Sequence, residues 1–232
     1  MSEKVTPIEI EDLSCKACFK EPELCLCAVV SKLPSRLHVL ILQHPQEPDK
    51  TLGSARLAHS ALENSTLKVG LSWPNLAKAL GRPAENVKWG VLYLGGRSQE
   101  KTPPNYRAPR LAIKAKGEKS FSAIDPGEFH GLEGIVVLDG TWSQAKTLWW
   151  RNAWLLKLNR LVISPNRKSL YGELRREPRR ECLSTIESIA ETLEALGEKT
   201  QVTETLRSYF GELLKRYRAL SKASKPAKAP SA

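Results

Sequence analysis

The chain has 232 residues, a hydrophobic content of 41% and a formal net charge of +11. That length and apolar content suit one core domain with a small appendage. No apolar run approaches the ~20 residues that a membrane-spanning helix needs, and the acidic segment 1–13 lacks the apolar stretch of a secretory signal. We therefore expect a soluble, cytoplasmic protein.

The positive charge is concentrated in two segments. Residues 215–232 carry six basic residues and no acidic one, and residues 165–180 carry six basic residues against Glu173 and Glu177. Such an excess predicts a polyanionic partner, because cations that neutralise phosphates release counterions. For the terminal segment, a solubilising tail is the alternative.

Four of the five cysteines follow the N-terminal pattern C-x2-C-x6-C-x-C: Cys15, Cys18, Cys25 and Cys27. Clustered cysteines in a reducing compartment favour a metal site over disulfides. Four thiolates suit a closed tetrahedral zinc site, whose role is structural. A labile dithiol or a partly occupied site is the alternative. Cys182 is separate, and we expect it to be a small packed residue.

In the first half of the chain, strands alternate with short helices. The predicted strands are residues 37–42 and 87–94, with one edge strand near 111–113, and the predicted helices are residues 54–62 and 74–80. Pro45 ends the first strand, because proline cannot donate to a strand ladder. The polar, proline-containing stretch 97–119 is otherwise expected to be irregular.

Asp139 lies at the end of the most informative segment. The apolar run 135–138 before it predicts a buried strand, and Gly140 permits a tight turn. Thr141, with Gln144 three residues later, forms a capping-box pattern that starts a helix at residues 142–151. Asp139 is therefore expected at the carboxyl end of a strand, where ligands bind in open α/β sheets. A plain turn-forming role is the alternative.

The last third of the chain predicts one strand and two helices. Residues 160–164 fit a strand that enters the basic segment, and Ser184 with Glu187 forms a second capping box for a helix that ends near residue 196. Residues 202–220 form a long amphipathic helix. The three tryptophans that follow Trp142 are expected to pack the helix that begins there: Trp149, Trp150 and Trp154.

This alternation predicts an α/β fold with a mostly parallel sheet flanked by helices. The expected organisation is an N-terminal segment with the four-cysteine zinc motif at residues 1–32, a catalytic domain at residues 33–220 and a disordered basic tail at residues 221–232.

Five segments, in this order, resemble the DTW-domain family, which includes the tRNA-uridine aminocarboxypropyltransferases. They are QHPQE at 43–47, KT with SARLA at 50–58, LDGTW at 138–142, Tyr171 with RREP at 175–178, and LSTIE at 183–187. They look like the family's H-P-x-E stretch, the helix after it, the D-x-T-W signature, the Y-x-x-R-R-x-P loop and the L-S-T-x-E helix start. The chain departs from the pattern at Leu170, where the family often has arginine, and before Ser54, where the fit is loose.

The resemblance implies a SPOUT-like fold with a C-terminal trefoil knot, which pattern reasoning alone would not propose because knots are rare. It also implies transfer of the 3-amino-3-carboxypropyl group of S-adenosylmethionine to the base nitrogen N3 of a tRNA uridine, with release of methylthioadenosine. Asp139 is the expected catalytic residue, either as the base that takes the imide proton or as the partner of the cofactor's ammonium.

The resemblance further implies two sets of binding residues. Those expected to bind the cofactor are Leu94, Leu138, Gly140, Thr141, Trp142, Ser164, Tyr171, Leu183, Ser184 and Thr185. Those expected to bind tRNA are His44, Arg56, Arg167, Lys168, Arg175, Arg176, Arg179 and Arg180. Core packing is the alternative for Trp142, and helix capping for Ser184 and Thr185. We expect no membrane and no obligate protein partner.

Three other functions remain open from the sequence. A SPOUT-type RNA methyltransferase would use the same cofactor but release S-adenosylhomocysteine. A non-catalytic zinc-containing RNA-binding protein would explain the cysteines and the charge, and it would bind no cofactor. A relative that modifies rRNA would use the same transfer chemistry.

Overall fold

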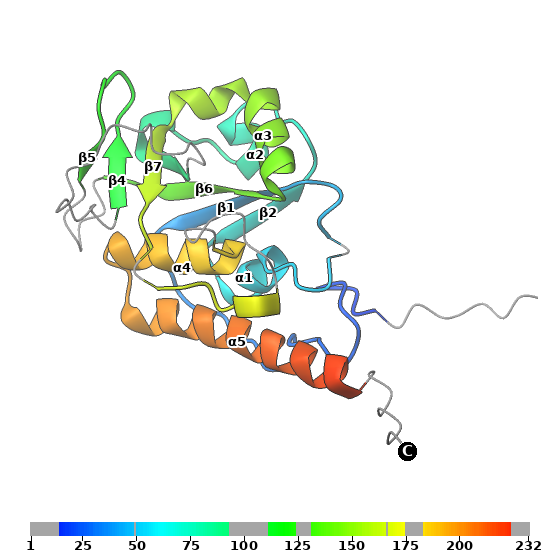
Figure 1. The fold of residues 1–232 in the computed structure, drawn as a ribbon. Helices are drawn as coiled ribbons and strands as arrows, with labels where there is room; N and C mark the ends of the chain where they lie inside the picture. Colours follow the sequence, from blue (N-terminus) through cyan, green and yellow to red (C-terminus); the bar gives the residue numbers. More distant parts are fainter. Residues whose placement is uncertain are drawn as a thin grey trace, which may run out of the picture.

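A seven-stranded sheet of order β2-β1-β6-β3-β7-β4-β5 forms the centre of the protein (Figure 1). The structure is a computed structural model that describes residues 14–48, 50–92, 111–123, 131–165, 167–174 and 183–223. The strands are β1 (His38–Gln43), β2 (Ser65–Val69), β3 (Trp89–Leu92), β4 (Leu111–Lys114), β5 (Ser122–Ala123), β6 (Gly134–Asp139) and β7 (Asn159–Ile163). The first five strands in this order, β2, β1, β6, β3 and β7, pair in parallel, and β4 and β5 add an antiparallel edge.

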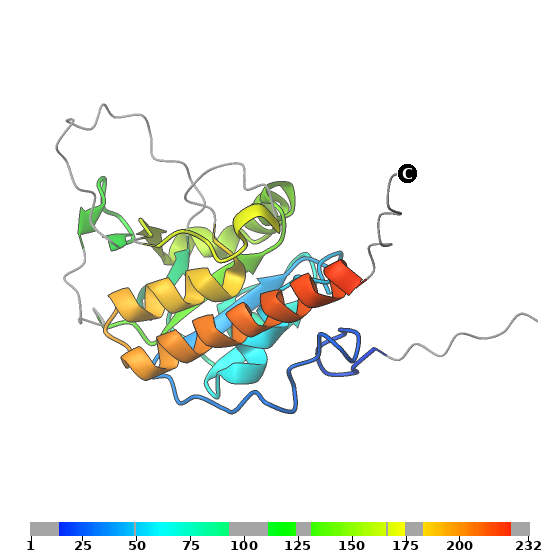
Figure 2. The ribbon, with the colours of Figure 1, turned by 60° about the horizontal axis from the view of Figure 1, so that its bottom comes forward.

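Helices cover both faces of the sheet, as expected for parallel strands. The elements are α1 (Ala55–Ala61), α2 (Leu76–Leu80), α3 (Trp142–Arg151), α4 (Thr185–Ala195) and α5 (Thr200–Ala223), with short 3-10 turns η1 (Asn86–Lys88), η2 (Ala153–Lys157) and η3 (Gly172–Leu174). In Figure 1, α2 and α3 lie on one side of the sheet and α1, α4 and α5 on the other. Figure 2 shows α4 and α5 side by side over that second face.

In each central strand, the side chains of successive residues pack into the hydrophobic cores on opposite faces of the sheet. In β1, Val39 and Ile41 pack with α1, α4 and α5, whereas Leu40 and Leu42 pack with α2 and α3. This follows from the two-residue period of a strand. Gln43 continues the set that faces α4, and β6 repeats the pattern up to Asp139. The sheet therefore directs two polar side chains toward α4 at its carboxyl edge.

The structure confirms the mostly parallel α/β sheet and most of the predicted elements, within a few residues at each end. Two strands were missed: β2, a half-exposed outer strand whose short alternating pattern gives a weak signal, and β5, an exposed edge strand of only two residues. The long last helix begins at Thr200 and continues to Ala223, past the predicted start of the tail. None of the described helices has the length and apolarity needed to cross a membrane.

Candidate active site and cysteine cluster

Asp139 and Gln43 form the centre of the candidate site. Parallel pairing of β1 with β6 places the two residues opposite each other at the last position of each strand. The amide Nε2 of Gln43 donates a hydrogen bond of 2.8 Å to Oδ2 of Asp139. Both side chains are buried, with Asp139 only 6% exposed. Oε1 of Gln43 is also buried, and it accepts no hydrogen bond from the residues that the structure describes.

The start of α4 provides the second partner of Asp139. The hydroxyl of Thr185 donates to Oδ1 of Asp139, so both carboxylate oxygens accept a hydrogen bond. Hydrogen bonds of this kind stabilise the negative charge of a carboxylate. The positive end of the α4 dipole adds to that stabilisation. Gln43 and Thr185 therefore hold the Asp139 carboxyl group in one orientation beside a helix N-terminus.

The turn after Asp139 brings α3 to the same edge of the sheet. Thr141 and Gln144 form the predicted capping box, in which Oε1 of Gln144 accepts from the Thr141 N–H at 2.6 Å. A Cβ atom at Gly140 would lie 2.8 Å from Cβ of Gln144, so this close approach requires glycine. Trp142 is 38% exposed and is therefore not a core residue.

Glu187 connects the segment after β7 to the start of α4. Its buried carboxylate accepts from the Ser184 N–H at 2.9 Å, the Ser184 hydroxyl at 2.6 Å, the Ser169 hydroxyl at 2.9 Å and the Leu170 N–H at 2.7 Å. The capping box predicted from the sequence is thus present, and it has two further donors. Because four donors converge on this one carboxylate, it fixes residues 169–170 against the helix that contacts Asp139.

Replacing Glu187 with glutamine is expected to release residues 169–170. Either orientation of the new amide would direct its NH2 group at a donor, and an unsatisfied buried donor costs about 1–3 kcal/mol. Amide hydrogen exchange at Leu170 and Leu174 should accelerate about tenfold. As a control, Glu212→Gln on α5 changes a half-exposed carboxylate and should leave those amides unchanged. Equal exchange in both variants would contradict the role of Glu187.

Tyr171 lies deeper than expected for a ligand-stacking aromatic residue. Its hydroxyl donates to the Leu52 carbonyl at 3.0 Å, and its ring meets Phe210 edge-on at 5.0 Å. In this structure Tyr171 therefore has the contacts of a core residue. The expectation that the later tryptophans pack the helix is correct for Trp149 and Trp154 but wrong for Trp150, which is 78% exposed.

The predicted RNA-binding residues are only partly described. Arg167 is exposed and forms an ion pair with Glu204 at 3.0 Å, and Lys168 is exposed beside it. His44 lies just after β1, where its backbone N–H donates to the Asp139 carbonyl at 3.0 Å. The remaining predicted positions lie outside the described residues: Leu94, Arg175, Arg176, Arg179, Arg180 and Cys182.

The four cysteine thiols of the N-terminal segment converge, with all Sγ atoms within 4.8 Å of one another. Sγ of Cys15 lies 3.8 Å from that of Cys27, and Sγ of Cys18 lies 3.7 Å from that of Cys25. Four sulfurs at about 2.3 Å from a tetrahedral Zn²⁺ would be about 3.8 Å apart. The residues present therefore fit such an ion. Backbone N–H groups of Cys18 and Ala17 lower the pKa of Cys15 to about 6, whereas burial raises the pKa of Cys18 and Cys27.

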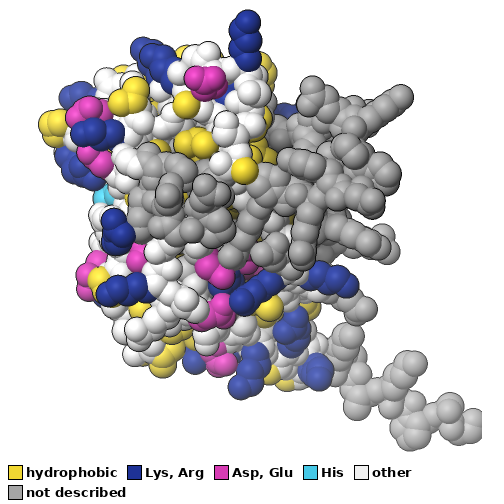
Figure 3. All heavy atoms as spheres, turned by 90° about the vertical axis from the view of Figure 1, so that its left-hand side faces the viewer, with side chains coloured by type: hydrophobic (Ala, Val, Ile, Leu, Met, Phe, Trp, Pro, Cys, Tyr) yellow, Lys and Arg dark blue, Asp and Glu magenta, His cyan; other side chains and the backbone are white. Residues whose placement is uncertain are grey.

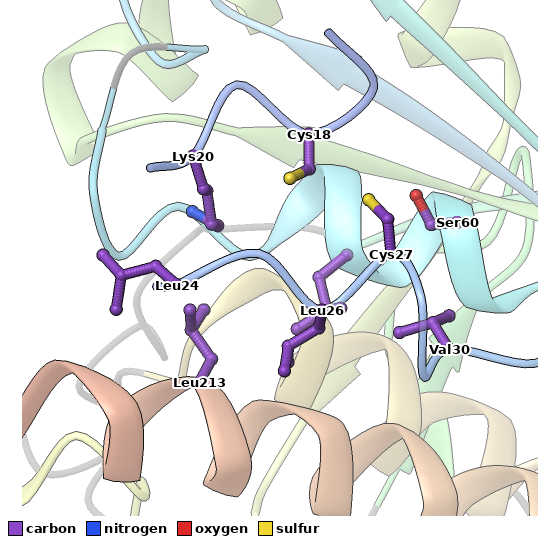
Figure 4. Close-up of a pocket in the computed structure, with 9 residues that line it drawn as sticks. Cys18, Lys20, Leu24, Leu26, Cys27, Val30, Ser60 and Leu213 are labelled. Atoms are coloured by element: carbon purple, nitrogen blue, oxygen red, sulfur yellow. The ribbon is translucent and has the colours of Figure 1, made fainter. Parts of the chain in front are cut away.

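The cysteine segment is attached to the domain at several points. Nζ of the buried Lys20 donates to the Thr51 carbonyl at 2.7 Å, and Arg216 of α5 donates to the Cys25 carbonyl at 2.7 Å. Arg56, predicted to bind RNA, places its guanidinium 4.1 Å from the ring centre of Phe19. Figure 4 shows Cys18 and Cys27 beside a small cavity that Leu213 of α5 also lines. This position is consistent with a structural role.

Comparisons with known proteins agree with the motifs. The chain matches the DTW domain over residues 12–218. It is 25% identical over 205 residues to tRNA-uridine aminocarboxypropyltransferase 2 of Macaca fascicularis, and 26% identical over 197 residues to the protein of the same name of Mus musculus. Each alignment covers 83% of this chain and 59% of the relative, so the chain spans less than two thirds of their length.

The Drosophila melanogaster protein with that name is 24% identical over 204 residues, which cover 83% of this chain and 70% of the relative. No solved structure matches the chain. The domain match extends from before the cysteine cluster to the last turns of α5 and includes every element of the candidate site. The chain therefore belongs to the DTW domain family.

Proposed function

We propose that this protein transfers the 3-amino-3-carboxypropyl group of S-adenosylmethionine to N3 of a uridine in tRNA and releases methylthioadenosine. Family membership and the names of the relatives support the reaction class. The observation that carries the proposal is the buried Asp139 carboxylate, held by Gln43 and Thr185 at the carboxyl edge of the sheet. Ligands bind at this edge in open α/β folds.

The residues around Asp139 suit the amino-acid end of the donor. The carboxylate and the unfilled Oε1 of Gln43 could both accept hydrogen bonds from an ammonium group. At the N-terminus of α4, the backbone N–H of Thr185 suits a carboxylate, since the N–H groups of Ser184, Ile186 and Glu187 already donate within the protein. The hydrogen bonds from Gln43 and Thr185 fix the orientation of the Asp139 carboxyl group, which suits a lasting contact to the donor. Of the two roles considered for Asp139, we favour the partner of the ammonium.

The donor supplies an activated sulfonium leaving group when it is bound. Transfer then joins uridine N3 to the terminal carbon of the side chain, breaks the bond between that carbon and sulfur, and leaves the electron pair on sulfur. The imide proton of uridine passes to water. The protein's contribution is to direct the carbon chain, rather than the methyl group, toward the base. Residues 138–142, Ser164 and residues 183–185 are the proposed contacts for the donor.

For the tRNA, we propose phosphate contacts from the basic segment around Arg175 and Arg176. Changing both to alanine should weaken tRNA binding and reduce the slope of log K against log salt by about two. Salt-dependent binding measurements check this. The double variant Lys116→Ala/Lys199→Ala also removes two exposed charges, outside both basic segments, and should leave the slope unchanged. Equal slopes in both variants would contradict the assignment.

We also propose zinc for the cysteine cluster and a SPOUT-like trefoil knot for the fold. β7 pairs with β3, yet α4, which follows β7, contacts Asp139 of β6 and Ser54 beside α1. Two segments of the chain therefore leave neighbouring strands: the segment that follows β7 and the connection from β3 to β6. A knot requires one of these segments to thread the other. An experimental structure that traces residues 93–110 and 175–182 would test this.

Incubation of the protein with S-adenosylmethionine and unmodified tRNA tests the function. The expected result is an aminocarboxypropyl mass on a uridine nucleoside together with methylthioadenosine. A methyl mass with S-adenosylhomocysteine would instead identify a methyltransferase. Formation of neither product, with tRNA still bound, would refute the proposed reaction.

A further inference from the structure

The outer side of α3 carries an exposed aromatic and basic row of side chains. Trp142, Lys146 and Trp150 recur at every fourth residue, so they lie on one side of the helix, while Ala145 and Leu148 pack inward. Trp150 is 78% exposed and Trp142 38%. Burying an indole stabilises a protein, so a tryptophan left in water is a candidate for a contact surface. We call these three residues the α3 stripe.

The segment of chain that contains the α3 stripe carries charge of one sign. From Gly140 to Gly172 the sequence has six lysines and arginines and neither aspartate nor glutamate. Lys146, Arg151 and Lys157 are exposed there, and none of these side chains forms an ion pair with another described residue. Over much of the side drawn in Figure 3, acidic side chains instead lie beside lysines and arginines. Positive charge and exposed aromatic rings coincide at the α3 stripe.

The α3 stripe begins at the carboxyl edge of the sheet, where the candidate active site lies, and continues along the outer side of α3. Its first residue, Trp142, comes three residues after Asp139 in the sequence. Helical side chains lean toward the helix N-terminus, so Lys146 and Trp150 lean toward that site. The helix rises about 1.5 Å per residue, which gives the stripe a length of about 12 Å. A ligand that reaches Asp139 could therefore contact the stripe along its length.

We propose that the α3 stripe binds unpaired tRNA nucleotides that flank the target uridine. Trp150 provides a stacking surface for a base, and Lys146 contacts a phosphate. Unpaired bases are recognised by stacking on aromatic side chains, with cations along the backbone. This inference rests on the proposed function, because it takes tRNA as the substrate, and it adds the surface and the part of the tRNA that would bind there.

The test is the affinity for unmodified tRNA, measured without S-adenosylmethionine at several salt concentrations. Trp150→Ala should weaken binding about tenfold with an unchanged salt slope, because stacking carries no charge. Trp150→Phe should retain most of the affinity. Lys146→Gln should reduce the slope by about one. Matched controls on other elements, Val87→Ala and Lys199→Gln, replace exposed side chains outside the two basic segments and should change neither quantity.

Unchanged tRNA affinity in both Trp150→Ala and Lys146→Gln would overturn the inference. A change from dimer to monomer in Trp150→Ala, with tRNA affinity retained, would also overturn it and identify the α3 stripe as a contact between two copies of the chain. The proposed reaction is tested separately. Stripe-dependent tRNA binding without methylthioadenosine formation would refute only the reaction, whereas turnover with intact binding in the variants would refute only the stripe.

Discussion

Replacing Asp139 with asparagine is expected to lower aminocarboxypropyl transfer at least hundredfold while the protein stays folded. Asparagine keeps the shape of the side chain but removes the charge that Gln43 and Thr185 stabilise. Removing one partner of a buried, hydrogen-bonded charge pair typically costs about 2–5 kcal/mol, and the loss of a positioned acid–base group typically costs about 10²–10⁴ in rate. Formation of methylthioadenosine measures the effect, and circular dichroism and the melting temperature monitor folding. Full turnover by the variant would refute any direct role for Asp139.

The same variant distinguishes the two roles of Asp139. If the carboxylate holds the donor's ammonium, Asp139→Asn should weaken S-adenosylmethionine binding, measured without tRNA. A donor analogue that lacks the amino group should then bind both proteins equally. If Asp139 is the base, donor affinity should be retained and only the transfer rate should fall. Thr185→Val and Thr185→Ser form a matched pair, because only the serine variant keeps the hydroxyl that donates to Asp139.

The sequence predicted the local features of this site well. The strand before Asp139, the turn at Gly140 and both capping boxes depend on residues within a few positions of one another. Hydrophobic runs and capping patterns record such short-range physics directly. The placement of Asp139 at a carboxyl edge could therefore be predicted before the order of the strands was known.

The partners of Asp139 could not be predicted in this way. Gln43 is 96 residues away in the chain, and its contact exists because β6 lies beside β1 rather than beside the strand that precedes it in sequence. Thr185 contacts Asp139 because α4 lies against β6, although the strand that precedes α4 in the chain is β7. Strand order and register are tertiary properties with no short-range signal. The exposure of Trp150 was not predicted, because aromatic residues on a helix that covers the core are usually packed.

Removing the four-cysteine cluster is expected to have the largest effect on stability. The protein purified under reducing conditions should contain one zinc per chain, and Cys18→Ser or Cys25→Ser should lose it. Binding of a structural zinc contributes about 10–16 kcal/mol in small zinc-finger peptides. Here only part of that free energy should appear as domain stability, because most of the core lies outside the cysteine segment. We expect the melting temperature to fall by about 5–10 °C.

The cluster should affect more than its own segment. Leu24 and Leu26 belong to the core that α1 and α5 share with the sheet, and Lys20 holds the chain at Thr51, next to the Leu52 carbonyl that Tyr171 contacts. Loss of the metal should therefore also accelerate amide hydrogen exchange around Leu52. This exchange can be measured without S-adenosylmethionine. Cys182→Ser is the control, since that cysteine lies outside the pattern, and it should keep the metal and the melting temperature. A metal-free protein whose stability depends on oxidation would contradict the zinc site and favour a dithiol.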